Sequence, residues 1–594
     1  MSGSKKAKKN RFLLVLILVI LLSSCSGGMP DKLWVKSESW SRALQLGETT
    51  LAASPPSLLD SSGKVYFMLF PRVEGEERIS QPELVILAEG GEITSRTLYD
   101  LQILKPSDAE IILGDQEINL FWVENYQLKT IRINEEGGLL SEVIVLSGDE
   151  RASDFSIVDK DGSYLIAYSG NRENPGIYLL TGELSELQKI ELDPEGIRLN
   201  QYLDEAGQLH LSWIRYPFTY GDFDIYYMQT DPQNIYPGDK ILVHTKNVSP
   251  SLRITGPVLG FDEEVGYLFW SEAIMAGMEA GVRTSFLQYF PLGRPDLIRP
   301  PMRLVVPASQ SLEAEEYISG YFSTGNRVPA GGIRYGSSYQ DHIVVIPGNF
   351  SEIAIAFRSQ SEHKWRDFRN QVNVAYLSDG LVTTYQPLSY TSTDSSHPNI
   401  FQDEDQDLYV SWLEKVESTF YVYFSTTDAA KRSSIDTVSV DDYLSLAAEG
   451  IFGILAGAIL SPFAAAVWGG AGLLAFIFGL VLSPFHKPIF RTVGEILSIV
   501  GGVYIFWWMK FATLPGINGG YVPFSAWIPR IPAEYEQPLI IGIPVLIGVI
   551  SAAFAWSKTY GKGSGSPINF HLIYSALDAL LSCAIYGVLI YGAF

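Results

Sequence analysis

Residues 202–227, YLDEAGQLHLSWIRYPFTYGDFDIYY, contain the pattern that recurs along most of this chain. Asp204 and Gly207 predict a tight turn, and residues 208–213 alternate polar and apolar side chains as a half-buried strand does. A second aromatic strand, 224–227, follows a polar loop. The stretch therefore predicts one hairpin of an antiparallel sheet.

The same turn and strand appear at Asp60 with 65–69, at Asp159 with 164–168 and at Asp403 with 408–412. In all four copies nine positions separate the Asp from the residue in the place of Trp213. Less regular copies end at Trp122, Trp270 and Phe357, and successive strands lie some 44 to 58 residues apart, except for a gap of 87 before Phe357. This period is typical of four-stranded propeller blades, because each blade buries its central strand against its neighbours.

The fold class predicted is an all-β propeller of about seven antiparallel four-stranded blades, followed by an all-α transmembrane domain. The blades are expected near 55–100, 107–147, 153–191, 196–245, 255–306, 342–390 and 396–440. Residues 307–341 are then a long insertion or part of an eighth blade, and residues 42–51 are a candidate for the strand that closes the ring. Two β-sandwiches are the alternative all-β architecture.

Charge and apolar content divide the chain into three parts. Residues 1–25 carry five positive charges and no negative ones, residues 26–440 carry 32 basic and 59 acidic side chains, and residues 441–594 are apolar almost throughout. The acidic middle part repels phosphate backbones, so we expect no nucleic-acid partner. The two cysteines, Cys25 and Cys583, provide neither a disulfide framework nor a thiolate metal site.

The amino terminus predicts export. Five basic residues precede an eleven-residue apolar run, 12–22, which is short for a membrane span and typical of a signal peptide. The run ends in Leu-Ser-Ser-Cys, which resembles the bacterial lipobox, and that resemblance implies lipidation of Cys25 after cleavage. The alternative is an uncleaved signal anchor. Either way we expect a bacterial membrane protein whose residues 26–440 lie outside the cytoplasm.

The blade motif, a D-x-x-G turn followed by an aromatic-ended strand, resembles that of the sialidase-like, Asp-box-containing propeller superfamily over about 380 residues. Sialidases of that superfamily carry a Phe/Tyr-Arg-Ile-Pro motif, an arginine triad and a Tyr/Glu nucleophile pair. Here Arg530-Ile531-Pro532 lies in the apolar block, and the strict Ser-x-Asp-x-Gly-x-x-Trp box is absent. The resemblance therefore implies the fold and assigns no catalytic residue.

Few residues of the propeller point to chemistry. Asp403, Asp405 and Asp407 alternate as calcium ligands could, but without the glycine of an EF-hand loop they are expected to form a solvated acidic turn. No other cofactor is predicted. Glu313, Glu315 and Glu316 are expected to be surface residues, and His342 and His363 to be lone histidines without metal-ligand spacing. We expect Trp213, Trp270 and Trp412 to belong to the core.

Residues 441–594 contain five apolar runs, near 443–460, 464–482, 493–509, 539–556 and 572–590, each about long enough to cross a bilayer. The positive-inside rule favours four crossings over five, so the number stays open. Gly453 and Gly457 would allow close helix packing. Asp578 is the clearest candidate for a functional ionisable residue at membrane depth, with Glu449 and Glu495 nearer to helix ends.

Three functions remain open. The first is a membrane-anchored cell-surface propeller that binds or scaffolds a protein or glycan without catalysis. The second is a diverged sialidase-like glycoside hydrolase, which requires arginines such as Arg215, Arg283 and Arg334 to converge with a carboxylate in the propeller mouth. The third is a component of a membrane assembly or transport system that acts through the helices around Asp578.

Overall fold

The computed structural model divides the chain into two compact units, 29–437 without 364–367 and, for the described helices, 438–594. It describes residues 31–591 with gaps, of which the longest are 305–339, 483–487 and 515–532. The shorter gaps are 34, 36–38, 77, 115–116, 161, 205, 218–220, 249–250, 279, 347–351, 365–366, 379–380, 390, 392 and 562–565. Cys25 and residues 307–339, discussed above, lie outside the described part, as do the side chains of His363 and Arg334.

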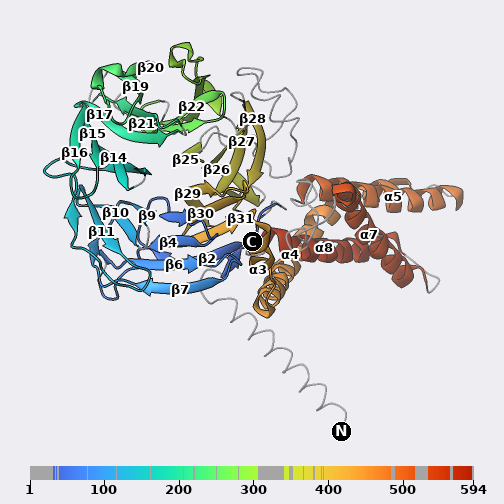
Figure 1. Ribbon diagram of the computed structural model, residues 1–594. Helices are drawn as coiled ribbons and strands as arrows, with labels where there is room; N and C mark the ends of the chain where they lie inside the picture. The colour runs from blue at the N-terminus through green and yellow to red at the C-terminus, as the bar shows by residue number, and fades with distance from the viewer. Residues whose placement is uncertain are drawn as a thin grey trace, which may run out of the picture. The chain divides into compact units, whose positions relative to one another are not determined.

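The described residues of the first unit form a propeller of seven antiparallel blades around a common centre (Figure 1). From the centre outward, blade 1 is β3 (Ser57–Leu59), β4 (Val65–Leu69), β6 (Glu83–Leu87) and β7 (Ile93–Leu98), and blade 2 is β9 (Asp108–Leu113), β10 (Ile118–Glu124), β11 (Gln127–Ile133) and β12 (Ile144–Val145). Blade 3 is β13 (Asp154–Lys160), β14 (Ser163–Asn171), β15 (Asn174–Gly182) and β16 (Gln188–Asp193), and blade 4 is β17 (Gly196–Leu203), β18 (Leu209–Arg215), β19 (Gly221–Thr230) and β20 (Ile241–Val248).

Blade 5 is β21 (Leu252–Phe261), β22 (Val265–Ile274), β23 (Arg283–Pro291) and β24 (Met302–Leu304), and blade 6 is β25 (Gln340–Val345), β26 (Ile353–Lys364), β27 (Asp367–Ser378) and β28 (Leu381–Pro387). Blade 7 contains β29 (Asp394–Gln402), β30 (Leu408–Val416) and β31 (Thr419–Thr426). A small two-stranded sheet, β5 (Ile79–Ser80) with β8 (Ile103–Leu104), lies outside the blades. The seven-bladed propeller predicted from the sequence is confirmed, and the two-sandwich alternative is wrong.

The ring is closed by a strand from the beginning of the unit. β2 (Ala43–Thr49) pairs antiparallel with β31 and carries β1 (Lys32–Leu33) at its other edge, so blade 7 has five strands from both ends of the propeller sequence. Ser41 and Ser425, 384 positions apart, are joined by hydrogen bonds through backbone and side chain. The strand predicted between 42 and 51 therefore exists and closes the ring.

The recurring Asp holds its turn by two sets of hydrogen bonds. One carboxylate oxygen accepts the backbone N–H of the residue four positions on, just before the next strand, at 2.9 Å for Asp60, 2.7 Å for Asp204 and 2.8 Å for Asp403. The second oxygen contacts a side chain six positions on: Tyr66, His210 or Tyr409. The repeat in the sequence is therefore a repeat of one Asx-type turn fixed to a buried aromatic residue.

The aromatic strand is the second strand of each blade, and its tryptophans are buried. Each indole N–H donates to a buried carboxylate, because a buried Trp must still satisfy its donor. The pairs are Trp122 with Glu124 (3.4 Å), Trp213 with Asp193 (2.8 Å), Trp270 with Glu272 (3.3 Å) and Trp412 with Glu414 (2.7 Å). The expectation that Trp213, Trp270 and Trp412 belong to the core is confirmed.

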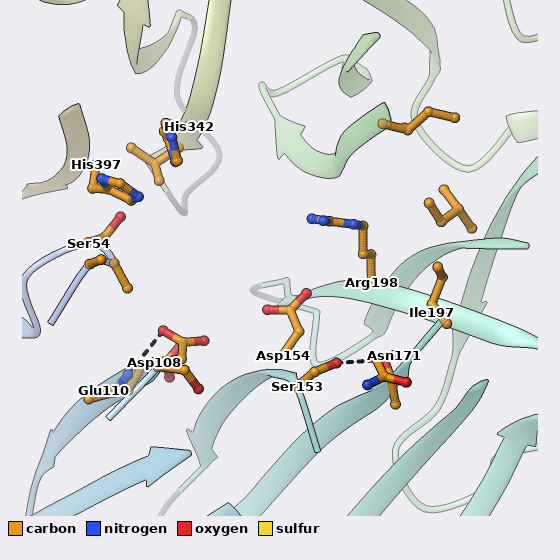
Figure 2. Close-up of a pocket in the computed structure, with 18 of the residues that line it drawn as sticks. Ser54, Asp108, Glu110, Ser153, Asp154, Asn171, Ile197, Arg198, His342 and His397 are labelled. Carbon is orange, nitrogen blue, oxygen red and sulfur yellow. Dashed lines mark hydrogen bonds between the residues drawn. The ribbon is translucent and has the colours of Figure 1, made fainter. Parts of the chain in front are cut away.

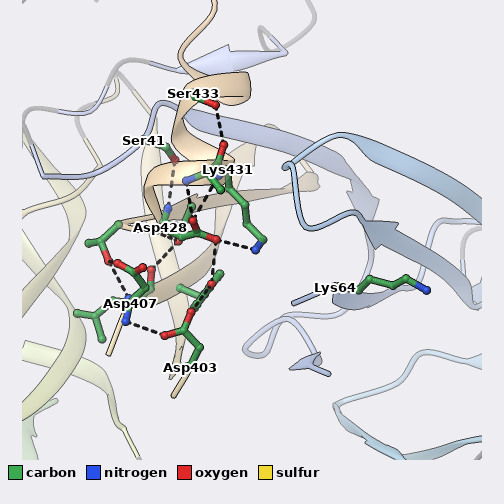
Figure 3. Close-up of polar contacts among 12 residues, drawn as sticks. Ser41, Lys64, Asp403, Asp407, Asp428, Lys431 and Ser433 are labelled. Atoms are coloured by element: carbon green, nitrogen blue, oxygen red, sulfur yellow. Dashed lines mark hydrogen bonds and ion pairs between the residues drawn. The ribbon is translucent and has the colours of Figure 1, made fainter. Parts of the chain in front are cut away.

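A short helix, α3 (Ala429–Ile435), ends the propeller unit. Asp428 caps it by accepting the backbone N–H groups of Ala430 and Lys431, and its other oxygen pairs with the Lys431 ammonium at 2.7 Å (Figure 3). Tyr409 also donates to Asp428, at 3.1 Å. The helix is thereby tied to the Asp turn of blade 7.

The second unit consists of helices. Those described are α4 (Val440–Leu482), α5 (Pro488–Thr513), α7 (Ala533–Thr559) and α8 (Pro567–Tyr591). Among them four segments are long and apolar enough to cross a membrane, namely Gly450–Leu473, Val493–Thr513, Pro538–Thr559 and Pro567–Gly587. The runs 443–460 and 464–482 were expected to be separate helices, and this is wrong: both belong to α4, which continues through Pro462.

Glycines bring α4 and α8 together. A methyl group added at Gly457 would lie 1.9 Å from the Cys583 carbonyl oxygen, and one added at Gly587 would lie 2.6 Å from the Gly453 carbonyl oxygen. Larger residues at these positions would push the two backbones apart. Gly453 and Gly457 therefore serve the close packing that their spacing predicts.

Candidate functional site

A cavity of about 1000 Å³ lies at the centre of the propeller. Residues from all seven blades line it, most of them on the innermost strands β3, β9, β13, β17, β21, β25 and β29 or in the loops beside them (Figure 2). Its volume is at the upper end of the range for small-molecule sites in proteins. The channel of the propeller is thus open over enough space for a small polar ligand.

The innermost strands are of two kinds. In blades 2 and 3 the pairs β9–β10 and β13–β14 keep one continuous register. In blades 4 to 7 the innermost strand has a β-bulge, and every bulge lies opposite the aromatic residue of the second strand: Trp213, Trp270, Phe357 or Trp412. Bulges redirect side chains and are frequent next to functional sites.

The bulges place three non-glycine residues in the left-handed region. Arg198 has φ of 52°, and His342 and His397 each have φ of 49°. All three line the cavity. A left-handed conformation costs an L-residue roughly 1–2 kcal/mol, and such strain is concentrated at functional sites. The same strain at equivalent positions of three blades therefore indicates that this part of the channel is a candidate functional site.

Blades 2 and 3 contribute what we term the acidic wall, Asp108, Glu110 and Asp154 (Figure 2). Burial raises the pKa of Asp108 and of Glu110 well above the ordinary range, and the neighbouring carboxylates add to the rise. Burial also raises the pKa of Asp154, against the effect of the Arg198 charge. The acidic wall therefore retains protons more readily than exposed carboxylates do and can both donate and accept hydrogen bonds.

Blades 4 to 7 contribute the basic wall, Arg198, Arg253, His342 and His397. The two imidazole rings stack with centroids 3.8 Å apart. Burial, followed by the charges of Arg358, Arg253 and Arg198, lowers the pKa of His342 to about 3. Burial and the neighbouring His342 and Arg358 likewise lower the pKa of His397 to about 3. Both imidazoles are consequently neutral at neutral pH, and the positive charge of the wall comes from its arginines.

The structure corrects the interpretation of His342 as a lone histidine, since it stacks on His397 inside the channel. The calcium candidates have other partners. Asp403 accepts from the Asp407 backbone and from Tyr409, while Asp407 accepts from Thr427 at 3.0 Å (Figure 3). Within the described residues no three His, Cys, Asp or Glu side chains are grouped as metal ligands.

Two of the arginines proposed for a sialidase-like mouth, Arg215 and Arg283, do not line the channel. Arg215 pairs with Asp193 at 2.8 Å and with Glu195 at 3.1 Å, and Arg283 is exposed at the start of β23. Arg334 and the glutamates Glu313, Glu315 and Glu316 lie outside the described residues. The convergence expected for that alternative is therefore not seen for Arg215 or Arg283.

The ionisable residue expected at membrane depth has a partner. Asp578 of α8 is fully buried and forms an ion pair with Lys510 of α5 at 2.7 Å. Ser582 donates to the same carboxylate at 3.1 Å and Tyr574 contacts it at 3.5 Å. Glu495 is exposed on α5, and Glu449 belongs to α4 with its side chain outside the described part. Asp578 thus joins two helices and has its charge balanced within the protein.

Sequence reasoning missed both walls, although a spacing signal exists. Asp108 and Asp154 precede the aromatic position of their own blades by 14 residues, and Arg198, His342 and His397 precede theirs by 15. The additional residue is the bulge. Once a blade repeat is aligned on its aromatic strand, this position identifies the side chains that face the channel.

No family model matches the chain, and no curated protein matches it. Among solved structures it is similar to the polysaccharide lyase Uly1, with 11% identity, a TM-score of 0.43 and coverage of 64% of this chain and 90% of that one. It is also similar to the subtype N10 neuraminidase-like protein of an influenza virus from the little yellow-shouldered bat, with 12% identity, a TM-score of 0.31 and coverage of 55% and 95%. An α-L-arabinanase of Penicillium chrysogenum, crystallised with arabinobiose, gives 11% identity, a TM-score of 0.32 and coverage of 67% and 99%.

Proposed function

We propose that this protein is a membrane-anchored propeller that binds a glycan in its central channel, on the outer side of a bacterial cytoplasmic membrane. The observation that carries the proposal is the cavity of about 1000 Å³, which acidic, basic and neutral polar side chains line together. A saccharide of one to three residues fits such a volume, and its hydroxyl groups can pair with donors and acceptors alike.

A folded protein partner fits the channel less well. A stable protein–protein interface buries roughly 800 Å² on each side and has an apolar centre, whereas this site is concave and lined with ionisable groups. The strained Arg198, His342 and His397 are also inside the channel, where they can contact a small ligand. The channel, rather than an outer face of the propeller, is therefore the proposed binding site.

Binding can be tested with the full-length protein in nanodiscs on a glycan array, followed by calorimetry of the glycans retained. We expect Asp154→Asn and Arg198→Gly to weaken binding at least tenfold. The matched control is Arg294→Ala, because Arg294 is exposed and pairs with Asp296 away from the channel. Equal affinity of the channel variants and the parent, or no glycan retained at millimolar concentration, would contradict the proposal.

A second candidate function is hydrolysis of a glycosidic bond at the acidic wall. It is favoured by the raised pKa values of Asp108, Glu110 and Asp154, since such cleavage needs one protonated and one ionised carboxyl group. Incubation with a panel of aryl glycosides that includes a sialoside separates the two functions. Turnover above background that is lost in Asp108→Asn would favour the hydrolase, and binding without turnover would favour the binding protein.

A further inference from the structure

We propose that the basic wall binds an anionic substituent of the channel ligand, a carboxylate, sulfate or phosphate carried on a sugar, and that His342 and His397 take up a proton when it binds. The inference rests on the proposed function and adds the chemical class of the ligand. It assigns to these two histidines and to Arg198 and Arg253 a role as the anion subsite.

The first observation is positive charge that faces the cavity. No carboxylate of the described residues lies within ion-pair distance of Arg198 or Arg253, and both side chains line the cavity. The neighbouring arginines have partners: Arg358 forms a bidentate ion pair with Asp341, and Arg172, which also lines the cavity, donates to the Pro217 carbonyl oxygen and stacks on Tyr216. Arg198 acts on the Asp154 carboxyl only as a nearby charge, without an ion pair. Two guanidinium groups on neighbouring blades thus retain the capacity to bind a charged oxygen group.

The second observation is the pair of neutral imidazoles beside these arginines. The ring of His397 contacts Ser396 Oγ through Nδ1 at 3.0 Å, and the Nε2 of His342 lies 4.0 Å from Asp341, which already pairs with Arg358. The charged groups that face the two rings are thus Arg198 of β17, Arg253 of β21, Asp341 of β25 and Arg358 of β26. Positive charges outnumber negative ones, and this opposes protonation of the histidines.

An anion among these groups reverses the balance. It offsets the arginine charges and accepts hydrogen bonds from imidazolium, so the pKa of each histidine is higher in the bound state than in the free state. A group whose pKa rises on binding makes the complex tighter as the pH falls through the bound value, and the gain ends near the free value of about 3. Uptake of one proton gives up to about tenfold in affinity per pH unit inside that window.

The same charges argue against a metal ion at the histidine pair. Two imidazoles could ligate a divalent cation, but the three arginines around them repel it. A third ligand of the usual kind is also missing in the described part of the chain. The electrostatics of the basic wall therefore favour an anion.

The test uses full-length protein in nanodiscs and two matched pairs of probes. Trigalacturonate is compared with its methyl ester, and lactose 3-sulfate with lactose, by calorimetry at pH 5, 6 and 7; inorganic sulfate is the arm without a sugar. We expect each charged sugar to bind at least tenfold more tightly than its uncharged partner, with affinity that rises at lower pH. Inorganic sulfate should bind weakly, because it does not fill the channel.

Variants assign the effect to residues. Arg253→Gln should reduce the preference for the charged sugar at least tenfold. His342→Asn and His397→Asn should flatten the pH dependence, since Asn tolerates the left-handed backbone and does not titrate. Arg294→Ala should behave as the parent does.

The outcomes separate the two proposals. Equal affinities for charged and uncharged sugars, or inorganic sulfate binding as tightly as the sulfated sugar, would overturn the anion subsite and leave the channel as a glycan site. A charge preference that persists unchanged in Arg253→Gln and in both histidine variants would also overturn it. If no sugar of either kind binds and the array retains none, the proposed function falls as well.

Discussion

The strained backbone at Arg198 leads to a quantitative prediction. Arg198 has φ of 52° and is the additional residue of the bulge between Ile197 and Leu199. Replacing it with Ala removes the side chain and keeps a Cβ in the left-handed region, whereas replacing it with Gly removes the side chain and the strain together. The comparison of Arg198→Gly with Arg198→Ala therefore isolates the backbone term.

The magnitude follows from two opposing contributions. The left-handed conformation costs Ala roughly 1–2 kcal/mol and costs Gly almost nothing. Gly loses more conformational freedom on folding than Ala, which costs about 0.5–1 kcal/mol. We expect Arg198→Gly to be more stable than Arg198→Ala by about 0.5–1 kcal/mol. Arg96 of β7 is the matched strand position with ordinary φ, and there the order should be reversed by a similar amount.

The assay is urea unfolding of the full-length protein in detergent, followed by tryptophan fluorescence, because Trp213 and Trp412 are buried in the propeller. The same preparations are titrated with the glycan identified on the array. Arg198→Gly should keep its stability and lose binding. A lower stability of Gly than of Ala at both positions would refute the assignment of strain, and unchanged binding in Arg198→Gly would refute its link to function.

Four further predictions concern other parts of the molecule. Leu46→Ala in the closing strand should lower the free energy of unfolding by about 2–5 kcal/mol, since Leu46 is fully buried. The Leu98 side chain is 54% exposed, so Leu98→Ala should change the free energy of unfolding by less than about 0.5 kcal/mol. Equal effects of the two substitutions in urea unfolding would contradict closure by β2. Burial raises the pKa of Asp193, but hydrogen bonds from Arg215, Trp213, Glu195 N and Lys240 lower that pKa more, so the ionised carboxylate stabilises the fold above the pKa of the unfolded state, and this stabilisation is lost as the pH falls through the pKa of the folded state. Asp193→Asn should therefore lose less stability than the parent between about pH 4 and pH 2. Parallel loss of stability with pH in the two proteins would contradict this. Lys510→Met should destabilise the helical unit by about 3–5 kcal/mol, measured by unfolding in detergent, because it leaves the Asp578 charge buried without a partner. Combining Lys510→Met with Asp578→Leu should recover most of that loss. A double variant as unstable as the single one would exclude the ion pair as the cause. Cys25→Ala should abolish labelling by a radioactive fatty acid while the protein stays in the membrane fraction, and equal labelling of variant and parent would disprove lipidation.

The blades could be predicted because their signal is local. Asp60, Asp204 and Asp403 each accept hydrogen bonds from backbone and side-chain groups within six positions. The spacing of these residues in the sequence therefore follows directly from the geometry of the hydrogen bonds. The ring closure could be predicted from the propeller itself, since a ring needs a strand that joins its ends.

The helices and the channel were harder for different physical reasons. Pro462 suggests a break between two helices, but α4 continues through it, and Ser461 donates its hydroxyl to the Ala458 carbonyl at 2.8 Å. The walls of the channel are formed by one position in each of several blades, occupied by Asp in some and by Arg or His in others. No shared residue type marks that position, and only the bulge and the ring bring the side chains together.

The pairing of β2 with β31, which is the seam that closes the ring, also sets an order of events during biosynthesis. Ser41 leaves the ribosome 384 residues before Ser425, so the edge of β2 that pairs with β31 has no partner until blade 7 has been made. Closing so long a loop is entropically costly and slow, and until then an exposed strand edge is available to wrong partners or to a chaperone. Among the described residues, the first segment long and apolar enough to cross a membrane begins at Gly450, shortly after the strand pairing that closes the ring. Translation arrested before residue 419 should therefore leave an open chain that is sensitive to protease, while arrest just beyond the seam should yield a closed and resistant propeller.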